Sequence, residues 1–274
     1  MPRNAAVERH RFEALGTSCS LFGVGVSRTE LVRGEFWVRK LAARITRFSD
    51  CSELTTLNRS DGEWVDVSPE LESLLREALR ANEVSGGLVN AAVLPSMVAI
   101  GYTRPLAEGA PVASLAVVHP APRLVDVLAV RPGRARLERG CGLDLGGIAK
   151  GWMADRLTTQ LGSNSLANLG GDLYAAGPGP AGGGWPVGFG GKTVMLRDQG
   201  AATSSVRKRK WGGLHHLIDP RTGLPSNSGL EEVSVVAATG CDAEVVAKTA
   251  LLLGPGLATA FCAAHAQAWW LHDR

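Results

Sequence analysis

The chain has 274 residues, 45% of them hydrophobic and 20% charged, so it is long enough to enclose a sizeable core. Its formal net charge is only +3 and its basic residues are scattered, which argues against a nucleic-acid-binding module with a basic face. No run reaches the roughly 18 apolar residues that span a bilayer, and no linker separates two parts of different composition. We expect one globular unit over residues 1–274, with neither nucleic acid nor a membrane as a partner.

The N-terminal segment and the cysteines favour a cytoplasmic protein. Met1–Ala14 is rich in charged residues and lacks the apolar stretch of a signal peptide. The cysteines are odd in number and widely spaced, which favours buried free thiols in a reducing compartment over a disulfide framework or a metal finger. They are Cys19, Cys51, Cys141, Cys241 and Cys262.

The first third of the chain predicts paired strands followed by helices. Residues 12–26 mix small and apolar residues, as a strand pair does, and apolar residues at helical spacing predict an amphipathic helix over 31–48. A loop or short helical turn follows at 52–58. Ser68 as N-cap with Pro69 at the first helical position predicts a second helix, which Gly86 and Gly87 end.

The middle of the chain predicts strands separated by turns. Residues 88–102 are apolar but interrupted, so they allow no single assignment. Segments 124–130 and 135–137 are typical of strands around a Pro-Gly turn. Residues 142–161 predict a strand, a glycine-rich turn and a helix, and 165–176 predict a strand.

The last third predicts further strands and a helix in no regular alternation. Two strands are expected within 187–202, a strand running into a turn at 215–223, and an alternating strand at 232–238. Residues 241–253 predict a helix, and 256–270 are weakly helical. Because strands and helices do not alternate regularly, we expect an α+β fold rather than a doubly wound sheet.

The segment Asp144–Gly151, DLGGIAKG, carries the first chemical signal. Its glycines allow the backbone to approach a ligand, and the helix that follows offers free N–H groups and a positive dipole end to an anion. Lys150 adds a cation, so the segment suits a phosphate-bearing ligand. It matches neither the P-loop nor the dinucleotide-binding glycine pattern, and a tight strand-to-helix turn accounts for it equally well.

Two segments further along each allow a structural and a functional interpretation. Asn168–Asp172, NLGGD, is either a plain turn or a backbone nest beside the first glycine loop. Adjacent histidines on a strand point to opposite faces, so at most one of His215 and His216 faces a given site. A single histidine beside a carboxylate such as Asp219 suits general-base chemistry, and a structural His–Asp contact is the alternative.

Two charged segments have a simple surface interpretation. The basic run Arg207–Lys210 is usually a solvated loop and less often a contact for phosphate. Glu244 and Lys248 stand four apart on the predicted helix, the order of a surface ion pair worth a few tenths of a kcal/mol, roughly.

Taken together and in order, these segments resemble the ApbE family of FAD:protein FMN transferases from about Phe12 to Gly254. The most specific pieces are DLGGIAKG at 144–151 and HLIDPRTG at 216–223. The resemblance implies an α+β fold of mostly antiparallel sheets packed with helices. It also implies cleavage of the FAD pyrophosphate, with Mg²⁺, attachment of FMN through a phosphoester to a Thr or Ser of a flavoprotein, and release of AMP.

The resemblance also assigns residues to the flavin. Two positions keep only part of the family's side-chain chemistry: Leu15 stands at a family methionine and Phe48 at a family tyrosine. Asn90 replaces a carboxylate with an amide. The cofactor-binding set that the resemblance implies is Leu15, Phe48, Leu88, Val89, Asn90, Asp144 and Lys150.

The catalytic and metal positions follow in the same way. His216 stands at the family histidine that activates the acceptor hydroxyl. Gly147 stands where a backbone carbonyl reaches the metal, Glu244 at a metal-ligating Asp, Ala247 at a neighbouring contact and Lys248 at a metal-ligating Thr. A glutamate still offers oxygen ligands. A protonated lysine cannot ligate, so its ammonium either lies near the phosphates in place of one metal contact or repels the metal.

These replacements leave two alternatives to the transferase. Lys248 and Asn90 favour a non-catalytic FAD-binding protein, which would bind FAD without regard to magnesium. An FAD pyrophosphatase, in contrast, would release AMP and FMN without any acceptor.

Overall fold

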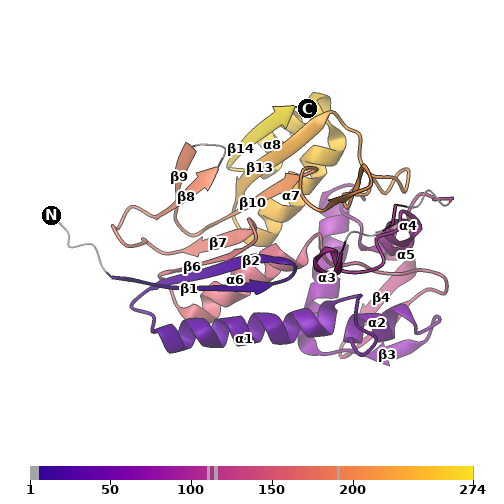
Figure 1. The fold of residues 1–274 in the computed structure, drawn as a ribbon, viewed down its shortest axis with the longest axis horizontal. Coiled ribbons are helices and arrows are strands. Elements are labelled where there is room, and N and C mark those ends of the chain that lie inside the picture. Colours follow the sequence, from indigo (N-terminus) through magenta and orange to yellow (C-terminus); the bar gives the residue numbers. More distant parts are fainter. Residues whose placement is uncertain (1–5, 110–111, 114–116, 190–191, 274) are drawn as a thin grey trace.

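In a computed structural model, which describes residues 6–109, 112–113, 117–189 and 192–273, a seven-stranded sheet is covered on one face by helices (Figure 1). Every strand pair described in this sheet is antiparallel, which confirms the expected α+β fold. The strands in spatial order are β1 (Val7–Ala14), β2 (Thr17–Val24), β6 (Ser165–Leu169), β7 (Leu173–Ala176), β10 (Gln199–Ser205), β13 (Leu230–Ala237) and β14 (Ala268–Asp273).

The remaining strands form smaller sheets. A three-stranded antiparallel sheet lies to one side of the large sheet, near α2 (Figure 1). One two-stranded hairpin shares an apolar cluster with Leu166 and Ala201 of the large sheet, and another lies close to the histidines. These strands are β3 (Trp64–Asp66), β5 (Arg134–Leu137) and β4 (Leu128–Arg131), then β8 (Trp185–Phe189) with β9 (Lys192–Leu196), and β11 (Lys210–Trp211) with β12 (Leu214–His215).

The helices fall into one group that packs against the large sheet and a second group that lies around the three-stranded sheet and the β11–β12 hairpin. The first group, α1, α6, α7 and α8, packs on or beside the large sheet. Its bounds are α1 (Arg28–Ile45), α6 (Ala149–Leu161), α7 (Gly240–Leu253) and α8 (Pro255–His265). The others are α2 (Glu53–Asn58), α3 (Pro69–Val84), α4 (Leu94–Ala99), α5 (Leu124–Val127) and the 3₁₀ turns Ala91–Val93 and Leu106–Glu108.

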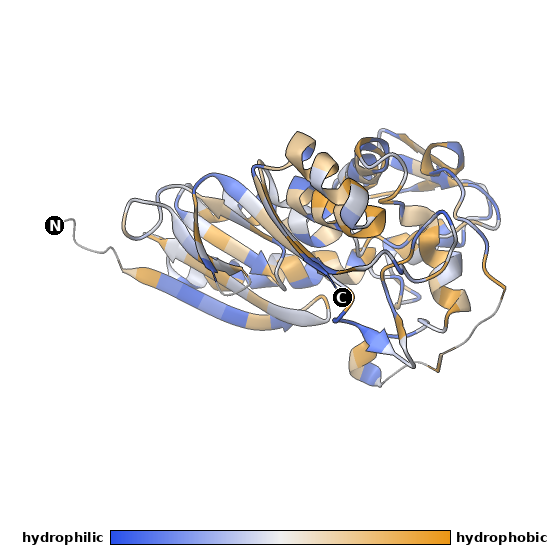
Figure 2. Ribbon diagram, turned by 90° about the horizontal axis from the view of Figure 1, so that it is seen from above, coloured by the Kyte–Doolittle hydropathy of each residue, from blue (hydrophilic) through white to orange (hydrophobic). Residues whose placement is uncertain are grey.

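The first strand pair begins earlier than predicted and ends in a two-residue turn. Leu15 and Gly16 both adopt positive φ, 56° and 68°, which is the backbone of a tight hairpin turn. The edge strand β1 carries a run of charged residues over 8–11, shown as the blue stretch near the N-terminus in Figure 2. Such charges protect a free sheet edge from pairing with another chain.

Side-chain caps fix where the two long N-terminal helices begin. Ser27 accepts from the N–H of Glu30, and the Glu30 side chain returns to the Ser27 N–H, so α1 starts three residues before the predicted boundary. Ser68 accepts from the Leu71 N–H, with Pro69 in the first turn, as predicted for α3. Helix α1 ends at Ile45, so Arg47 and Phe48 lie on the chain that leaves it.

Helices α6 and α7 approach each other closely at their first turns. A Cβ added to Gly151 would overlap the carbonyl of Gly240, so only glycine fits there. The carboxylate of Asp155 accepts from the N–H groups of Gly240 and Cys241, at 2.6 and 3.0 Å. These bonds cap α7 against α6, which brings Glu244 beside the start of α6.

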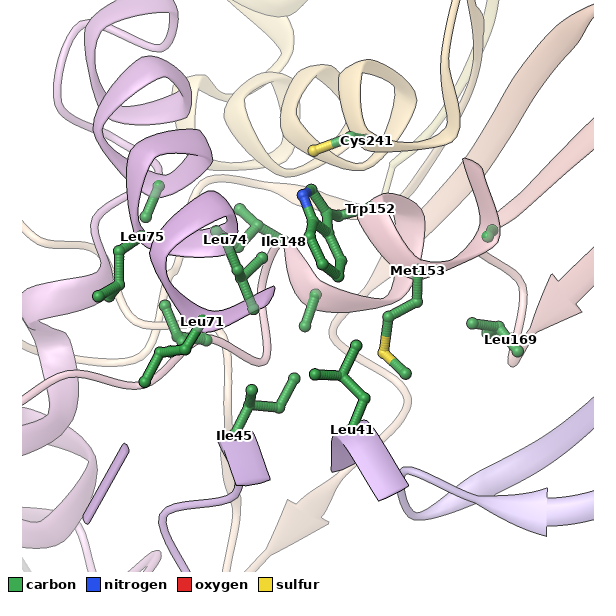
Figure 3. Packing of buried hydrophobic residues seen from close by; sticks show 14 of the residues in the cluster. Leu41, Ile45, Leu71, Leu74, Leu75, Ile148, Trp152, Met153, Leu169 and Cys241 are labelled. Carbon is green, nitrogen blue, oxygen red and sulfur yellow. The ribbon is translucent and has the colours of Figure 1, made fainter. Parts of the chain in front are cut away.

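The main core lies between these helices. Figure 3 shows the Trp152 indole of α6 close to Cys241 of α7 and to Ile148, with Leu41 and Ile45 of α1 below. Trp152 is 2% exposed. Leu71, Leu74 and Leu75 give α3 an apolar face toward the same cluster. The core therefore supports the start of α6 from beneath.

Several element predictions are wrong in detail. Residues 142–145 form no strand, although the predicted glycine turn is present at 146–148, and 124–127 form a single helical turn before β4. Segment 165–176 is a hairpin of two strands rather than one, and 187–202 contributes to three strands. The weakly helical end of the chain finishes as β14, where Trp269 and Trp270 pack on opposite faces of the sheet. These apolar contacts on both faces hide the period of two in the sequence.

All five cysteines are free, as expected; Cys19, Cys241 and Cys262 are buried, whereas Cys51 is exposed. Within the described ranges, no helix has the length and apolar character needed to cross a bilayer. Residues 1–5 of the N-terminal segment considered for a leader lie outside the described residues, and the segment forms β1 from Val7.

Candidate functional site

A cavity of about 740 Å³ opens where the β1–β2 turn, the end of α1, the start of α6 and the middle of α7 meet. Its volume lies within the range of about 300–1,000 Å³ that small-molecule and cofactor sites occupy. The glycine turn of Lys150 and the segment that carries His216 both line it. Two segments far apart in the sequence thus face one space.

The structure brings ten of the twelve predicted site residues to this cavity. Val89 is buried in the core and lines a small adjoining cavity instead. Ala247 is fully buried against the α7–β13 core and lines neither this cavity nor the small adjoining one. The ten lining residues are Leu15, Phe48, Leu88, Asn90, Asp144, Gly147, Lys150, His216, Glu244 and Lys248.

Lys150 is held by two buried carboxylates. Its Nζ contacts the Asp172 carboxylate and lies 3.1 Å from Glu244 Oε1. The exposed side-chain fractions are 16% for Lys150, 4% for Asp172 and 6% for Glu244. Burial lowers the pKa of Lys150, and the Glu244 carboxylate opposes this shift. Asp172 comes from the β6–β7 hairpin turn, so the NLGGD segment meets the first glycine loop through a side chain.

Glu244 corrects two expectations. Its Oε2 accepts from the Gly151 N–H at 2.8 Å, so this N–H at the start of α6 is not free for an anionic ligand. Glu244 is also buried and bonded to Lys150, so the interpretation of Glu244 and Lys248 as a surface ion pair is wrong. Helical spacing alone does not report which face of α7 is buried, and this helix is buried almost all round.

Lys248 extends from α7 over the backbone of Gly147. A Cβ added to Gly147 would overlap the Lys248 Nζ, so the absence of a side chain leaves room for the ammonium group. Lys248 lines both the main and the small cavity. Burial lowers the pKa of Lys248, while the Glu244 and Asp144 carboxylates oppose that shift.

These contacts decide whether the expected metal position fits Mg²⁺. A hard divalent ion needs about six oxygen ligands, several of them usually carboxylates or waters. Both Glu244 oxygens are engaged by Lys150 and Gly151, and Lys248 offers no lone pair while protonated. Among the residues that the structure describes, no group of three His, Cys, Asp or Glu side chains could hold a metal ion. The residues around Gly147 do not fit a divalent cation.

A cationic and aromatic wall forms the opposite part of the cavity. Arg47 is 5% exposed, and its Nε donates to Asp144 Oδ2 at 2.6 Å. Its guanidinium lies 4.1 Å from the Phe48 ring centroid and 4.7 Å from that of Tyr102. Its Nη2 is buried without a hydrogen-bond partner among the described residues. Neither Arg47 nor Tyr102 was predicted from the sequence; the position of Arg47 beside the expected flavin contact Phe48 was the available signal.

Asp144 and Asn90 serve the local backbone as well as the cavity. Asp144 accepts from the Gly146 N–H at 2.8 Å, so it shapes the glycine turn while bound to Arg47. Asn90 caps a 3₁₀ turn by accepting from the Ala92 N–H, and it donates to the Pro122 carbonyl. The amide can make both bonds at once, whereas a carboxylate could only accept.

His216 is the only one of the two adjacent histidines that lines the cavity. His215 is buried, with Nε2 bonded to the Ser226 carbonyl at 3.0 Å. The His216 Nδ1 is buried and has no bonding partner in the described ranges. Burial, followed by the charge of Arg209, lowers the pKa of His216 well below 6.5, so the ring is neutral near pH 7. Asp219 binds Arg221 within its own turn, so the expected carboxylate beside the histidine is engaged elsewhere.

The basic run divides between the surface and the cavity. Arg207 pairs with Glu231, and Lys208 is exposed on a loop, as the solvated-loop interpretation predicts, yet Lys208 and the half-buried Arg209 also line the cavity. Arg209 also donates to the Leu15 carbonyl at 3.2 Å.

The cavity is electropositive. Its lining carries five cationic side chains and three carboxylates, which leaves a net formal charge of +2. The cations are Arg47, Lys150, Lys208, Arg209 and Lys248, and the carboxylates are Asp144, Asp172 and Glu244. A doubly anionic ligand with an aromatic part therefore matches both the charge and the aromatic wall.

Comparison with known proteins gives a consistent result. The sequence model of the ApbE family matches residues 15–270. A protein of Treponema pallidum (strain Nichols) named FAD:protein FMN transferase is 32% identical, over 75% of this chain. The alignment spans 66% of that protein, just under two thirds of its length. A protein of the same name from Klebsiella pneumoniae (strain 342) is 29% identical, over 78% of this chain and 73% of its own length.

Solved structures share the fold. The ApbE protein of Thermotoga maritima superposes with a TM-score of 0.82 at 22% identity, covering 97% of this chain and 94% of that one. The flavinyl transferase ApbE of Pseudomonas stutzeri gives a TM-score of 0.80 at 20% identity, covering 99% and 94%. At these identities the likeness bears on the fold alone.

Proposed function

The chain belongs to the ApbE family, and from this premise we propose that it is an FAD:protein FMN transferase. One observation supports the proposal most directly: a single cavity joins the Lys150 turn, the aromatic wall and His216. The substrate is FAD, and the acceptor is a Thr or Ser hydroxyl of a flavoprotein. The products are the flavinylated protein and AMP.

The lining supports a particular orientation of FAD. Phe48 is 37% exposed and offers its ring to the flavin, while the Arg47 guanidinium packs on Phe48 and on the buried Tyr102. Lys150 and Lys248 line the same cavity and offer positive charge to the linked phosphates. Leu15 and Leu88 add apolar contact. In this role Asp144 positions Arg47, while Asn90 keeps the chain before α4 in place.

The reaction needs positioning and charge stabilisation rather than a covalent enzyme intermediate. The acceptor hydroxyl oxygen forms a bond to the phosphorus on the FMN side, and the phosphoanhydride bond to AMP breaks. Neutral His216 takes the hydroxyl proton, which returns to the departing AMP. Lys150 and the neighbouring cations stabilise the charge that builds on the phosphate oxygens. No step is assigned to a metal ion, because the donors around Gly147 do not fit one.

The test is an incubation of the purified chain with FAD and a flavoprotein acceptor domain that carries a Thr or Ser target. The proposal predicts a covalently fluorescent acceptor and an equal amount of AMP, both dependent on the hydroxyl. An acceptor variant with Ala at the target is the matched control. FAD binding without either product would mean a binding protein. AMP release without acceptor would mean a pyrophosphatase.

The roles of the individual site residues and a cytoplasmic location are part of this proposal. An Asn90→Asp variant would test whether the amide restricts the reaction. The expected result is a small change in transfer rate, because the Asn90 side chain bonds to the local backbone.

A further inference from the structure

Lys248 is a half-buried cation that makes no bond within the local fold. Its Nζ lies over Gly147 and faces the cavity, yet it makes no hydrogen bond or ion pair within the part of the chain that the structure describes. Taking an ammonium out of water is costly unless a hydrogen-bonding or ionic partner compensates it, and the Glu244 and Asp144 carboxylates act on Lys248 only through their charge. The side chain therefore points to an anionic ligand as its partner.

We propose that Lys248 supplies the positive charge that a divalent metal ion would otherwise bring to the linked phosphates, so that this chain binds FAD without metal. The inference rests on the proposed function, because it concerns how the same cavity holds FAD.

The contacts of Glu244 and Lys248 around Gly147 support FAD binding without a metal ion. A metal at Gly147 would have to displace the Lys248 ammonium and also compete for Glu244. That carboxylate is fixed by two bonds, to Lys150 at 3.1 Å and to the Gly151 N–H at 2.8 Å. Arg209 adds a further positive charge to the same cavity. A divalent cation would enter a space that already holds several positive charges.

The charge balance leads to the same conclusion. The lining has a net formal charge of +2, with Lys248 counted as an ammonium. The pyrophosphate of FAD carries one negative charge on each of its linked phosphates, so the two cancel without any added ion. An anion beside the ammonium also favours its charged form. A bound divalent ion would leave the complex with excess positive charge.

The experiment compares FAD affinity in Mg²⁺ and in EDTA, measured by flavin fluorescence on chain purified through EDTA. The wild-type dissociation constant should agree within about twofold between the two buffers. Lys248→Met keeps the length of the side chain but removes the charge, and should weaken FAD binding about ten- to hundredfold in both buffers. Lys192→Met, an exposed lysine on β9, is the matched control and should bind like wild type.

The outcomes separate this inference from the proposed function. Tight binding only in Mg²⁺, or wild-type affinity in Lys248→Met, would overturn the metal-free role of Lys248 and leave FAD binding intact. No FAD binding in either buffer would overturn both. If Lys248→Met does not fold, a calorimetric titration of Mg²⁺ into the wild-type FAD complex decides the point. No binding heat is expected, and saturable binding would contradict the inference.

Discussion

Removing the Lys150 charge tests how much its ion pairs with Asp172 and Glu244 stabilise the fold. Lys150→Met leaves Asp172 and Glu244, both almost fully buried, without their shared cation. Breaking a buried ion pair by deleting one partner costs about 3–5 kcal/mol, because an uncompensated charge remains inside. Since Lys150 retains a little exposure and the Gly151 N–H still bonds to Glu244, we expect a loss near the lower end, about 3 kcal/mol.

Urea unfolding of four proteins measures this loss: wild type, Lys150→Met, Asp172→Asn and the double variant. The double variant should lose less than the sum of the single losses, by about 0.5–3 kcal/mol, because the Asp172 charge is no longer stranded. Lys208→Met is the matched control, since Lys208 lines the same cavity without a carboxylate contact in the described residues, and its change should stay within about 0.5 kcal/mol. Strictly additive losses, or a Lys150→Met loss equal to that of the control, would contradict the role of Lys150 as the shared cation of Asp172 and Glu244.

Three further predictions concern the helix pair and the base. Gly151→Ala would press a Cβ on the Gly240 carbonyl and should lower the unfolding free energy by about 1–3 kcal/mol, seen as a lower urea midpoint. His216→Ala should slow flavin transfer about 10²–10⁴-fold with little change in FAD affinity. Because the His216 pKa lies well below 6.5, the wild-type rate should stay level as the pH falls through 6.5, and a drop there would count against the assignment. Burial raises the Asp155 pKa from 3.8 to about 6, so the folded state holds this proton more tightly than the unfolded chain does. The resulting contribution to stability is present in acid and is lost as the pH rises from about 4 through about 6. Asp155→Asn should therefore flatten the fall of the urea midpoint over this pH range.

Local sequence features were enough to predict much of the fold. The helical spacing of apolar residues predicted α1 and the Ser68 cap predicted α3, because these features act within a few residues of each other, whereas the Ser27 cap that fixes the start of α1 was not recognised. The strand at the end of the chain, β14, was harder to predict. The residues of β14 pair with β13 and pack on two faces, so their strand character depends on contacts far away in sequence.

The site divides in the same way. Glycine turns and the histidine pair indicated which segments carry chemistry, and Lys150 and His216 do face one cavity. Sequence spacing could not show that Asp172 would contact Lys150, or that Glu244 would bond to it rather than to Lys248. The Gly151–Gly240 approach decides that arrangement, because it sets the register of α7 against α6. The position of Arg47 beside Phe48 was visible in the sequence, but a buried Nη2 with no partner among the described residues is a property of the folded cavity.

Comparing the affinities of FAD and riboflavin tests most directly whether the cavity binds a dinucleotide through its linked phosphates. Both can be titrated into the purified chain and followed by flavin fluorescence. We expect saturable FAD binding at one site. Riboflavin should bind about a hundredfold more weakly, because it shares the isoalloxazine ring but lacks the phosphates. Equal affinity for the two flavins, or no FAD binding, would contradict it.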